Sequence, residues 1–591
     1  MGTPSAGEFR GLLPYLKPYT GRYILGFVCL LVVDGAQILV PQCIKRAVDT
    51  LAAGDFALGR MYALALEVLA LAAVISAGRF LWRYFIHGSS RRIEAQVRQD
   101  YFKRLLSLSY DFYQRNKIGD LMARATNDLG AVRMSIGMGF VAMIDGTAMA
   151  ITILVIMFVQ DPATAFFAVL PLPVISILMI IFGKAVGRLF RRVQETYSAL
   201  SDIAQETFAG IRVVKSFAKE WWFIRKFADG NRDYQAANMS LVKAFGLAFP
   251  LVMFLSGMTT LILVLVGGAK VMRGTMSIGQ FAAFFSYLHM LVWPIMSLGF
   301  MINMMQRGAA SMARINEILN TEPSIVQVTA GADSPAPAPD SGAAVSIRHL
   351  TFTYPGEGGK EVPPALADVS LDIPRGAFVG ILGKTGSGKS TLLKTLPRLV
   401  DPPAGTVFVN GRDVREYPLD ELRSLFAAAP QDTYLFSDTI RANAAYGADS
   451  PTDGAIREAL DAAALTRDLE EFPLGWDTVI GERGVTLSGG QKQRAAIARA
   501  LMRQGAEILL LDDALSAVDA DTERTFLTRF LEERRGRTTV LVSHRVSTLQ
   551  HTDFVAVLDG GRIIERGTPR ELMDLGGFFA RTAQLQRLEA G

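Results

Sequence analysis

The chain has 591 residues, of which 50% are hydrophobic, and its mean hydropathy is +0.27. It is too long for one hydrophobic core and too apolar for an ordinary soluble protein, so we expect several domains, one of them in a membrane. The net charge of +5 does not call for a nucleic-acid partner, and the two cysteines, Cys29 and Cys43, share one apolar stretch, which argues against a disulfide scaffold or a thiolate metal site.

Six long apolar segments fill the first half of the chain, each near the ~20 residues that cross a bilayer. They are Tyr23–Ile44, Tyr62–Ile86, Gly137–Val159, Ala163–Val186, Phe245–Met272 and Gly279–Met304. One such segment could be a buried helix of a soluble protein. Six in succession, with little amphipathic period, predict a membrane domain of six transmembrane helices.

Basic residues concentrate in the two long loops of this half, between the second and third segments and between the fourth and fifth. The alternate loops carry fewer, although Lys45, Arg46 and Arg60 make the first loop the weakest part of this case. By the positive-inside rule, both long loops and both ends of this half are cytoplasmic. We therefore expect a multi-pass protein of the cell's inner (cytoplasmic) membrane, with both termini and the following domain in the cytoplasm.

The two long loops carry helix-like patterns at Val97–Leu108 and Ile203–Ala218, so we expect the membrane helices to continue into the cytoplasm. Each loop also has a polar centre near a glycine, at Tyr110–Asp120 and Thr207–Lys219. These centres could be short transverse helices that dock on another domain. A solvated basic loop fits the composition equally well.

Five ionisable residues lie away from the ends of the apolar segments: Asp34, Glu67, Arg79, Asp145 and His289. Charge in hydrocarbon is costly, so such groups usually face a bundle interior or a water-filled cavity, and they are candidates for lining a substrate path. Structural pairing is the alternative, or snorkelling to the headgroups for Glu67 and Arg79. Asp34 and Asp145 are the stronger candidates.

The composition changes after Leu319. Residues 321–344 are rich in proline, alanine and serine and predict a solvated linker between a membrane domain at 1–320 and a second domain at 345–591. In that domain, short β-type runs alternate with helical stretches, which predicts an α/β domain with a largely parallel sheet. The runs are Val345–Ile347, Ala377–Leu382, Val407–Val409, Ile508–Leu511, Thr539–Val542 and Phe554–Leu558.

A glycine-rich loop follows the second of these runs and matches the phosphate-binding pattern GxxxxGK[ST] at every fixed position. It comprises Gly383, Lys384, Thr385, Gly386, Ser387, Gly388, Lys389 and Ser390, and Thr391 continues it into a helix. Glycines let backbone N–H groups turn toward phosphate oxygens, and a helix N-terminus favours an anion. Lys389 would reach the β- and γ-phosphates and Ser390 would bind Mg²⁺. The loop predicts a P-loop nucleotide-binding domain.

Three further features fit a phosphate site. The apolar run 508–511 ends in Asp512 and Asp513, and Asp512 could hold Mg²⁺, directly or through water. Ser488, Gly489, Gly490 and Gln491 precede a helical stretch and could present N–H groups to an anion, although a glycine turn that caps the helix is the simpler interpretation. His544 follows the run 539–542, where a lone histidine is more often a surface residue.

These motifs, in this order, resemble the ATP-binding cassette (ABC) family, and with the six-span domain ahead of them the chain resembles a half-size ABC exporter. The segment Leu487–Gln491 matches the family's signature sequence in full. The resemblance implies ATP and Mg²⁺ as cofactors. It implies that Tyr354 stacks on adenine, that Gln431 touches Mg²⁺ and that His544 lies near the γ-phosphate. It also places Glu482 in the loop that meets the membrane domain and Asp519 in the loop that crosses between cassettes. It also implies a dimer, in which each nucleotide lies between the phosphate loop of one cassette and the signature of the other.

One position departs from the family pattern. Consensus members have glutamate after the Mg²⁺-binding aspartate, where it activates the attacking water, and this chain has Asp513. Aspartate is one methylene shorter, and a misplacement of ~1 Å can cost on the order of a hundredfold in rate. The change resembles the degenerate subunit of bacterial heterodimeric multidrug exporters, so we expect a heterodimer with a second ABC half-transporter, with a slow homodimer as the alternative.

The resemblance implies ATP-driven export of amphipathic small molecules across the membrane, with the lipid bilayer and a second subunit as partners and no nucleic acid. A lipid flippase and a peptide exporter are alternatives within transport. An ATP-sensing membrane regulator is the alternative outside it, since a slow site suits a sensor as well.

Overall fold

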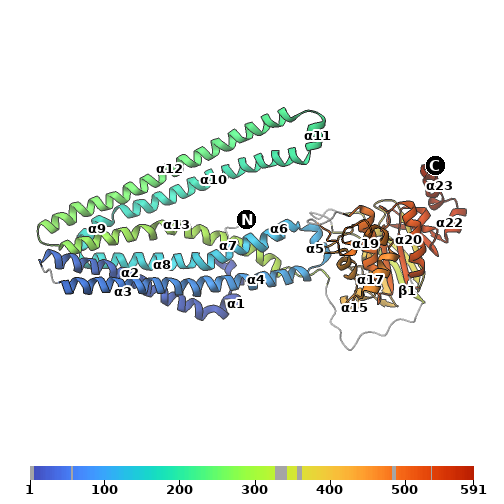
Figure 1. Cartoon of the computed structure of the whole chain (residues 1–591), viewed down its shortest axis with the longest axis horizontal. Coiled ribbons are helices and arrows are strands. Elements are labelled where there is room, and N and C mark those ends of the chain that lie inside the picture. The colour runs from blue at the N-terminus through green and yellow to red at the C-terminus, as the bar shows by residue number, and fades with distance from the viewer. Residues whose placement is uncertain are drawn as a thin grey trace. The chain divides into compact units, whose positions relative to one another are not determined.

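A computed structural model describes residues 6–54, 58–325, 342–355, 362–481, 487–533 and 536–590. The chain divides into two compact units (Figure 1). Unit 1 comprises Met1–Ser107 and Asn116–Glu322, and unit 2 comprises Leu108–Arg115 and Pro323–Gly591. A short piece of the first long loop therefore packs with the second half of the chain.

The described residues of unit 1 form helices joined by short turns. Its longer helices are α2 (Thr20–Ala52), α3 (Leu58–Trp82), α4 (Gly88–Ser107), α8 (Phe140–Gln160), α10 (Pro171–Ala209), α12 (Glu220–Met272) and α13 (Ile278–Asn320). The shorter ones are η1 (Ala6–Leu12), α1 (Leu13–Leu16), η2 (Lys17–Tyr19), α6 (Ile118–Ala123), α7 (Leu129–Met134), α9 (Pro162–Val169) and α11 (Ile211–Ser216). The π-helical turns η3 (Arg83–His87), η4 (Arg124–Asp128) and η5 (Ser135–Gly139) join neighbouring helices into longer segments.

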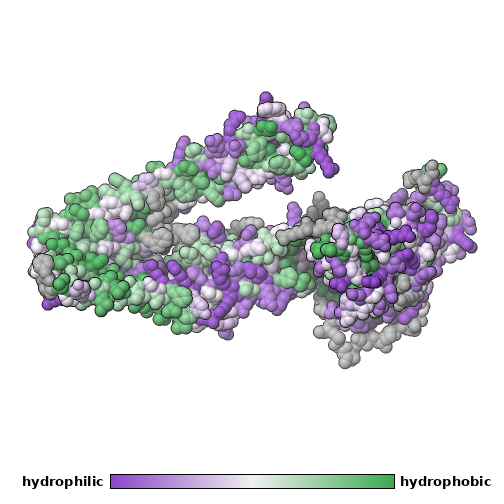
Figure 2. All heavy atoms as spheres, in the orientation of Figure 1, coloured by the Kyte–Doolittle hydropathy of each residue, from purple (hydrophilic) through white to green (hydrophobic). Residues whose placement is uncertain are grey.

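Four helical segments of the described residues are long and apolar enough to cross a membrane: Gly7–Ala52, Leu58–Ser107, Ile118–Gln160 and Glu220–Met272. Two further apolar helices, Pro162–Ile175 and Ile278–Val292, are shorter. Four of the six predicted spans thus lie on helices that are long and apolar enough to cross a membrane. A total of six transmembrane helices remains a prediction. In unit 1, Figure 2 shows hydrophobic residues gathered around the left ends of α2, α8 and α12, and more hydrophilic residues toward the opposite ends of α10 and α12.

The prediction that helices continue beyond the apolar segments is confirmed by α4 and α10, whose polar ends reach Ser107 and Ala209. Short helices form at both polar loop centres, α5 (Tyr110–Arg115) and α11 (Ile211–Ser216). Within unit 1, α10 packs along α12, and α2 packs against α3 and α13.

Helices α2 and α13 lie close together at Gly279. The Gly279 N–H donates to Asp49 Oδ1 at 2.8 Å, and the Ser277 hydroxyl donates to Asp49 Oδ2 at 3.1 Å. A Cβ at Gly279 would come within 2.1 Å of the carbonyl oxygen of Lys45. Only glycine allows the two backbones to meet at this distance.

We expect Gly279→Ala to lower the thermal stability of the purified protein, because a new methyl group would force α2 and α13 apart at a cost of about 1–3 kcal/mol. The matched control is Gly257→Ala on α12, where no atom lies within 4 Å of the added Cβ. Alanine is there the better helix former by about 1 kcal/mol, so that variant should keep or gain stability. The measurement is the temperature at which half of the monodisperse peak is lost in size-exclusion chromatography. Equal midpoints for both variants would contradict the close approach.

Unit 2 contains two sheets. The larger has six strands in the order β10-β9-β3-β8-β7-β6, and the smaller has four in the order β2-β1-β4-β5. The strands are β1 (Ala343–Phe352), β2 (Leu366–Pro374), β3 (Phe378–Gly383), β4 (Val407–Val409), β5 (Arg412–Asp413), β6 (Phe426–Ala429), β7 (Ile508–Asp512), β8 (Thr538–Val542), β9 (Phe554–Asp559) and β10 (Arg562–Gly567). The helices are α5, α14 (Lys389–Thr395), α15 (Leu419–Ser424), α16 (Ile440–Ala445), α17 (Asp453–Ala462), α18 (Thr466–Leu469), η7 (Gly475–Asp477), α19 (Gly489–Leu501), α20 (Ala520–Glu533), α21 (Val546–Leu549), α22 (Pro569–Asp574) and α23 (Phe578–Ala590).

All six predicted strands form, and the predicted largely parallel sheet is confirmed by the larger sheet, which contains four of them; the other two lie in the smaller sheet. Strands β3, β6, β7, β8 and β9 are parallel, whereas β1 and β4 pair antiparallel in the smaller sheet. Strand β1 also begins at Ala343, inside the expected linker, whose residues 326–341 lie outside the described part of the chain.

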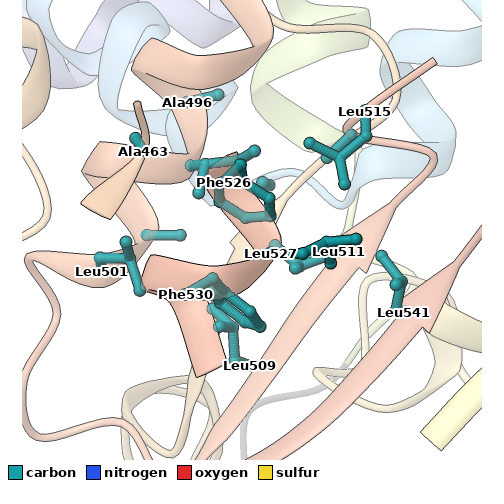
Figure 3. Packing of buried hydrophobic residues seen from close by; sticks show 14 of the residues in the cluster. Ala463, Ala496, Leu501, Leu509, Leu511, Leu515, Phe526, Leu527, Phe530 and Leu541 are labelled. Carbon is teal, nitrogen blue, oxygen red and sulfur yellow. The ribbon is translucent and has the colours of Figure 1, made fainter. Parts of the chain in front are cut away.

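Both faces of the large sheet are buried, which fits parallel strands. Along β7, Leu509 and Leu511 belong to the core on one face, and Ile508 and Leu510 belong to the core on the other. Figure 3 shows helix α20 laying Phe526, Leu527 and Phe530 over Leu509 and Leu511. The rings of Phe526 and Phe530 stack with centroids 5.1 Å apart. This packing holds the C-terminal end of β7, and with it Asp512, in place.

Candidate nucleotide site

The glycine-rich loop lies between β3 and α14, as the sequence predicts. Gly386 and Gly388 have φ angles of +83° and +100°, and a Cβ at Gly388 would come within 2.5 Å of the carbonyl oxygen of Ala365. Both glycines are therefore required by the backbone path of the loop. That path turns the chain from the buried strand β3 directly into α14, which begins at Lys389.

Lys389 lies beneath the loop and is only 6% exposed. Its Nζ donates to the carbonyl oxygens of Gly383 at 2.8 Å and Lys384 at 2.7 Å. Burial lowers the pKa of Lys389, while the carboxylates of Asp513 and Asp512 act in the opposite direction. A buried ammonium group held at the base of an N–H-rich loop is suited to bind phosphate oxygens.

A cavity of about 190 Å³ opens beside this loop within unit 2. Its lining gathers predicted residues from four separate stretches of the chain: Thr385, Gly386, Ser387, Gly388, Lys389, Ser390, Thr391, Gln431, Asp512, Asp513 and His544. Parallel strands bring the stretches together, because β3, β7 and β8 all end at the same edge of the sheet. The fold thus places the two carboxylates and the histidine around one phosphate-sized space.

Asp512 has the environment of a magnesium ligand. Its carboxylate lies at the end of β7, is 9% exposed, and its Oδ1 accepts no hydrogen bond from the described residues. Burial raises the pKa of Asp512, although the nearby Ser390 hydroxyl and Lys394 lower it. A buried carboxylate oxygen without a donor, beside a serine hydroxyl, fits a hard divalent cation that prefers oxygen ligands. Asp512 and Ser390 therefore match the donor set expected for Mg²⁺.

Asp513 has a left-handed backbone, with φ of +48°, which aspartate tolerates better than most residues. Its N–H donates to the carbonyl oxygen of Val542 at 3.0 Å, and its side chain borders the cavity.

His544 also borders the cavity, and Gln586 of α23 holds the loop that contains His544. Gln586 Nε2 donates to the His544 carbonyl oxygen at 2.6 Å, and its Oε1 accepts from the Val546 N–H at 2.9 Å. No sequence motif marks Gln586.

Three predicted residues lie beside the cavity without lining it. The Tyr354 hydroxyl donates to Thr391 Oγ1 at 3.3 Å, which places the ring next to the start of α14. The carbonyl oxygens of Gly383 and Lys384 face Lys389, but the Lys384 ammonium lies over the ring of Phe578, 5.6 Å from its centroid. The Lys384 side chain thus contacts α23, and only its backbone serves the loop.

The signature residues Ser488, Gly489, Gly490 and Gln491 do not line this cavity. They begin α19 as a capping box, in which the Ser488 hydroxyl accepts from the Gln491 N–H at 3.3 Å and Gln491 Oε1 accepts from the Ser488 N–H at 2.9 Å. A Cβ at Gly490 would lie 2.8 Å from the carbonyl oxygen of Ala517. Asp519 caps the next helix through Thr522, and Glu482 lies outside the described residues.

Asp468 fastens the signature helix to its surroundings and was not found from the sequence. Its carboxylate accepts from Gln491 Nε2 at 2.9 Å and from Arg494 at 2.7 and 3.1 Å. The Arg494 guanidinium is 9% exposed and also donates to the carbonyl oxygen of Ala464 at 2.5 Å. Because neither residue belongs to a motif, only the fold reveals the pairing.

We expect Arg494→Met to destabilise unit 2 by ~3 kcal/mol, because it leaves the Asp468 carboxylate largely buried without its cation. Arg529→Met is the matched control, since Arg529 pairs with Asp461 at 2.5 Å but both side chains are exposed, at 39% and 53%. An exposed pair contributes about 0–1 kcal/mol. The measurement is the midpoint of urea unfolding followed by tryptophan fluorescence of the full chain. A control shift as large as the Arg494 shift would show that burial of the pair does not matter.

Comparison with known proteins supports the whole-chain resemblance. The family profile "ABC transporter transmembrane region" matches residues 23–295, and the profile "ABC transporter" matches residues 366–516. The chain is 37% identical over 576 residues to the probable multidrug resistance ABC transporter ATP-binding/permease protein YheI of Bacillus subtilis, with 97% of each chain covered. It is 33% identical over 583 residues to the multidrug resistance-like ATP-binding protein MdlA of Escherichia coli, covering 98% of this chain and 97% of that one.

A third relative, an ATP-dependent lipid A-core flippase of Syntrophus aciditrophicus, is 30% identical over 582 residues, with 98% of this chain and 94% of that one covered. Among solved structures, a bacterial Atm1-family ABC exporter with ATP bound superimposes with a TM-score of 0.75. It covers 96% of this chain and 98% of its own at 24% identity, a likeness that concerns the fold.

Proposed function

Because the chain belongs to the ATP-binding cassette transporter family, we propose that it is one subunit of a dimeric pump that exports amphipathic small molecules across the cytoplasmic membrane. The observation that carries this proposal is the cavity in unit 2, where the phosphate loop, Asp512, Asp513 and His544 meet. Unit 1 supplies helices long and apolar enough to span a bilayer. We propose six spans with both termini cytoplasmic, in a membrane domain at 1–320, a linker at 321–344 and a cassette domain at 345–591.

ATP would supply the free energy of the cycle, and a bound Mg²⁺ would neutralise phosphate charge. We assign the phosphates to the loop N–H groups and Lys389, the magnesium to Ser390, Asp512 and Gln431, and the adenine to the face of Tyr354. Asp513 orients the attacking water and His544 faces the γ-phosphate. Asp513 performs its role poorly because its carboxylate is one methylene shorter than that of glutamate, so this site binds ATP well and hydrolyses it slowly.

Within unit 2, contacts between α5 of the first long loop and α14 could transmit movement of the cassette to that loop. Helix α5 lies against α14, with the Lys394 ammonium 5.3 Å from the centroid of the Tyr110 ring. The Ser109 hydroxyl accepts from the Ile325 N–H at 3.0 Å, and the Ser324 hydroxyl donates to Asp111 at 2.8 Å. Lys389 begins the same helix that Tyr110 touches, so a shift of α14 on nucleotide binding would reach α5 directly.

Two features support a second half-transporter as partner. The signature residues Ser488–Gln491 lie away from this chain's own cavity, so they are free to complete a site in another cassette. Around α11, large aromatic side chains are exposed on the α10–α12 hairpin, with Phe208, Phe217 and Trp221 at 72%, 71% and 74%. Exposed aromatic patches of this kind usually mark protein interfaces. Asp513 together with a complete signature favours a heterodimer.

The heterodimer proposal predicts the ATPase rate of this chain purified alone in lipid nanodiscs. We expect near-background turnover both unmodified and as Asp513→Glu, because the missing component is the partner subunit. If the chain instead assembles with itself, Asp513→Glu should raise the rate on the order of a hundredfold by bringing the carboxylate to the water. Brisk turnover of the unmodified chain would contradict the weakened site altogether.

Export is tested with inside-out vesicles that contain the chain and its co-purified partner. A fluorescent amphipathic dye should accumulate when ATP is added, and should not do so with the Lys389→Met variant. Accumulation of labelled phospholipid in one leaflet, without dye transport, would favour a flippase. The relative named as a lipid A-core flippase makes that alternative concrete. ATP binding without vectorial movement of any substrate would favour a membrane regulator.

A further inference from the structure

The backbone around His544 is held by a residue of the C-terminal helix. Strand β8 ends at Val542, and the Ser543 N–H donates to the carbonyl oxygen of Ile381 on β3 at 3.2 Å. The next carbonyl oxygen along the chain, that of His544, accepts from Gln586 Nε2 of α23 at 2.6 Å. The peptide before the histidine is thus held by the sheet, and the peptide after it is held by α23.

Gln586 makes a second contact with the same loop. Its Oε1 accepts from the Val546 N–H at 2.9 Å, so one side-chain amide bridges the two backbone groups on either side of Arg545. Val546 is the first residue of α21, and Arg545 before it provides no side-chain cap for that helix. Gln586 therefore satisfies a helix N–H that has no partner within its own helix, and it fixes the peptide that follows His544.

Gln586 lies on the face of α23 that packs into unit 2. Phe579 and Ala583 of α23 belong to the same buried cluster as Val546 and Leu549 of α21. The spacing of positions 579, 583 and 586 places their side chains on one face of the helix. A half-buried amide in this row is costly unless it is hydrogen-bonded, and its bonds are those to the loop of His544. A packing role alone would be served at least as well by an apolar side chain.

The first residue of α23 contacts the other loop of the nucleotide cavity. The Phe578 ring centroid lies 5.6 Å from the Lys384 ammonium of the phosphate loop. The Glu565 carboxylate of β10 accepts from the N–H groups of Phe578 and, at 3.0 Å, Phe579, which fixes the start of the helix. Phe578 and Gln586 are about 12 Å apart along the helix. Helix α23 therefore connects the phosphate loop to the loop that carries the histidine.

Arg545 is anchored separately, in the loop that precedes α20. Its guanidinium donates to the carbonyl oxygens of Val518 at 2.9 Å and Ser516 at 3.2 Å. These contacts hold the end of a long side chain. The contacts of Gln586 hold the main chain of His544 itself, so they determine the direction in which the imidazole leaves the backbone.

We propose that Gln586 is a positioning residue for His544, which it aims at the γ-phosphate of ATP. The inference rests on the proposed function, in which His544 faces that phosphate, and it names the group that keeps the histidine there. Because ADP has no γ-phosphate, a correctly aimed histidine favours ATP over ADP, and a misaligned histidine loses that preference. Gln586 acts only through the backbone of His544.

The test measures the dissociation constants of ATP and ADP, each with Mg²⁺, for the purified full chain by competition with a fluorescent analogue. The histidine and the phosphate loop belong to one chain, so binding can be measured without a partner subunit. Gln586→Met keeps the length of the side chain and removes both hydrogen bonds. We expect it to weaken ATP binding about tenfold and to leave ADP binding unchanged. Gln586→Glu, which can accept from Val546 but cannot donate to the His544 carbonyl oxygen, should act in the same direction.

Gln584→Met is the matched control, because it is the same substitution at an exposed position of the same helix. It should leave both affinities unchanged. His544→Ala gives the full size of the effect, and adding Gln586→Met to it should weaken ATP binding no further, because two residues that act through one interaction are not additive. A purely structural role for Gln586 would instead weaken ATP and ADP binding together and would add to the effect of His544→Ala.

An unchanged ratio of ATP to ADP affinity in Gln586→Met, an equal loss for both nucleotides, or an additive double variant would overturn the proposal. Dye accumulation in vesicles tests the pump separately. Accumulation together with an ATP preference that does not depend on Gln586 would refute the positioning role and retain the pump. A preference that depends on Gln586, in a complex that moves no substrate, would support the positioning role and refute the pump.

Discussion

Lys389→Met should reduce the affinity of this chain for ATP by on the order of a hundredfold or more. The lysine ammonium is buried beneath the loop and held by the carbonyl oxygens of Gly383 and Lys384, so it lies in place before any phosphate arrives. Removing one partner of a buried, charge-assisted contact costs roughly 2–5 kcal/mol. Methionine keeps the length and the apolar stem of the side chain, so the fold of the loop should survive.

The measurement is the dissociation constant of a fluorescent ATP analogue with Mg²⁺, in the full chain. Lys394→Met is the matched control on the same helix, because Lys394 faces Tyr110 of α5. That variant should bind ATP nearly as the unmodified chain does and lose instead part of the response of transport to ATP. Equal affinity in the unmodified chain and Lys389→Met would refute the assignment of the cavity as the nucleotide site.

Ser488→Arg should abolish most ATP hydrolysis by the assembled complex, whereas Asp513→Asn should change it little. Under the heterodimer proposal, Ser488 begins the α19 capping box that completes the partner's competent site, so an arginine there blocks the main hydrolytic reaction. Loss of one positioned donor costs about 10²–10³ in rate. Asp513 belongs to the slow site, and removing its charge removes little from the total.

The measurement is phosphate release by the complex of the chain with its co-purified partner, at saturating ATP. Ser488→Ala, which removes only the hydroxyl, should be milder than the arginine variant. In a homodimer both Asp513 and Ser488 serve every site, so both substitutions would silence the protein to the same degree. That outcome would contradict the asymmetric assignment.

The sequence alone was enough to predict the phosphate loop and its chemistry. Gly386, Gly388 and Lys389 act through neighbours close along the chain, and their spacing fixes both the turn and the start of α14. The positions of the strands could also be predicted, because β3, β7, β8 and β9 are short apolar runs bounded by turns. The pairing of strands could not be predicted, since β1 and β4 have the same local sequence pattern but join an antiparallel sheet.

Contacts between residues that are distant along the chain could not be predicted from the sequence, because no fixed sequence separation marks them. Asp468 binds Arg494 and Gln491, and Gln586 holds the loop of His544, and each is an ordinary polar residue until the helices are placed. Of the six transmembrane spans predicted from the sequence, four lie on helices that are long and apolar enough to cross a membrane. Local composition cannot reveal which residues of different helices share a face.

The chemistry that depends on local order follows from the sequence: the phosphate loop, the carboxylates after β7, the signature that caps α19, and the long apolar segments. Which of these features meet depends on the tertiary structure. It gathered Gln431, Asp512, Asp513 and His544 around one cavity and kept Ser488 apart from it. It also buried Asp34, in the middle of α2, among the helices of unit 1. Burial and charge compensation are properties of three-dimensional neighbours, so no reading of a single segment can supply them.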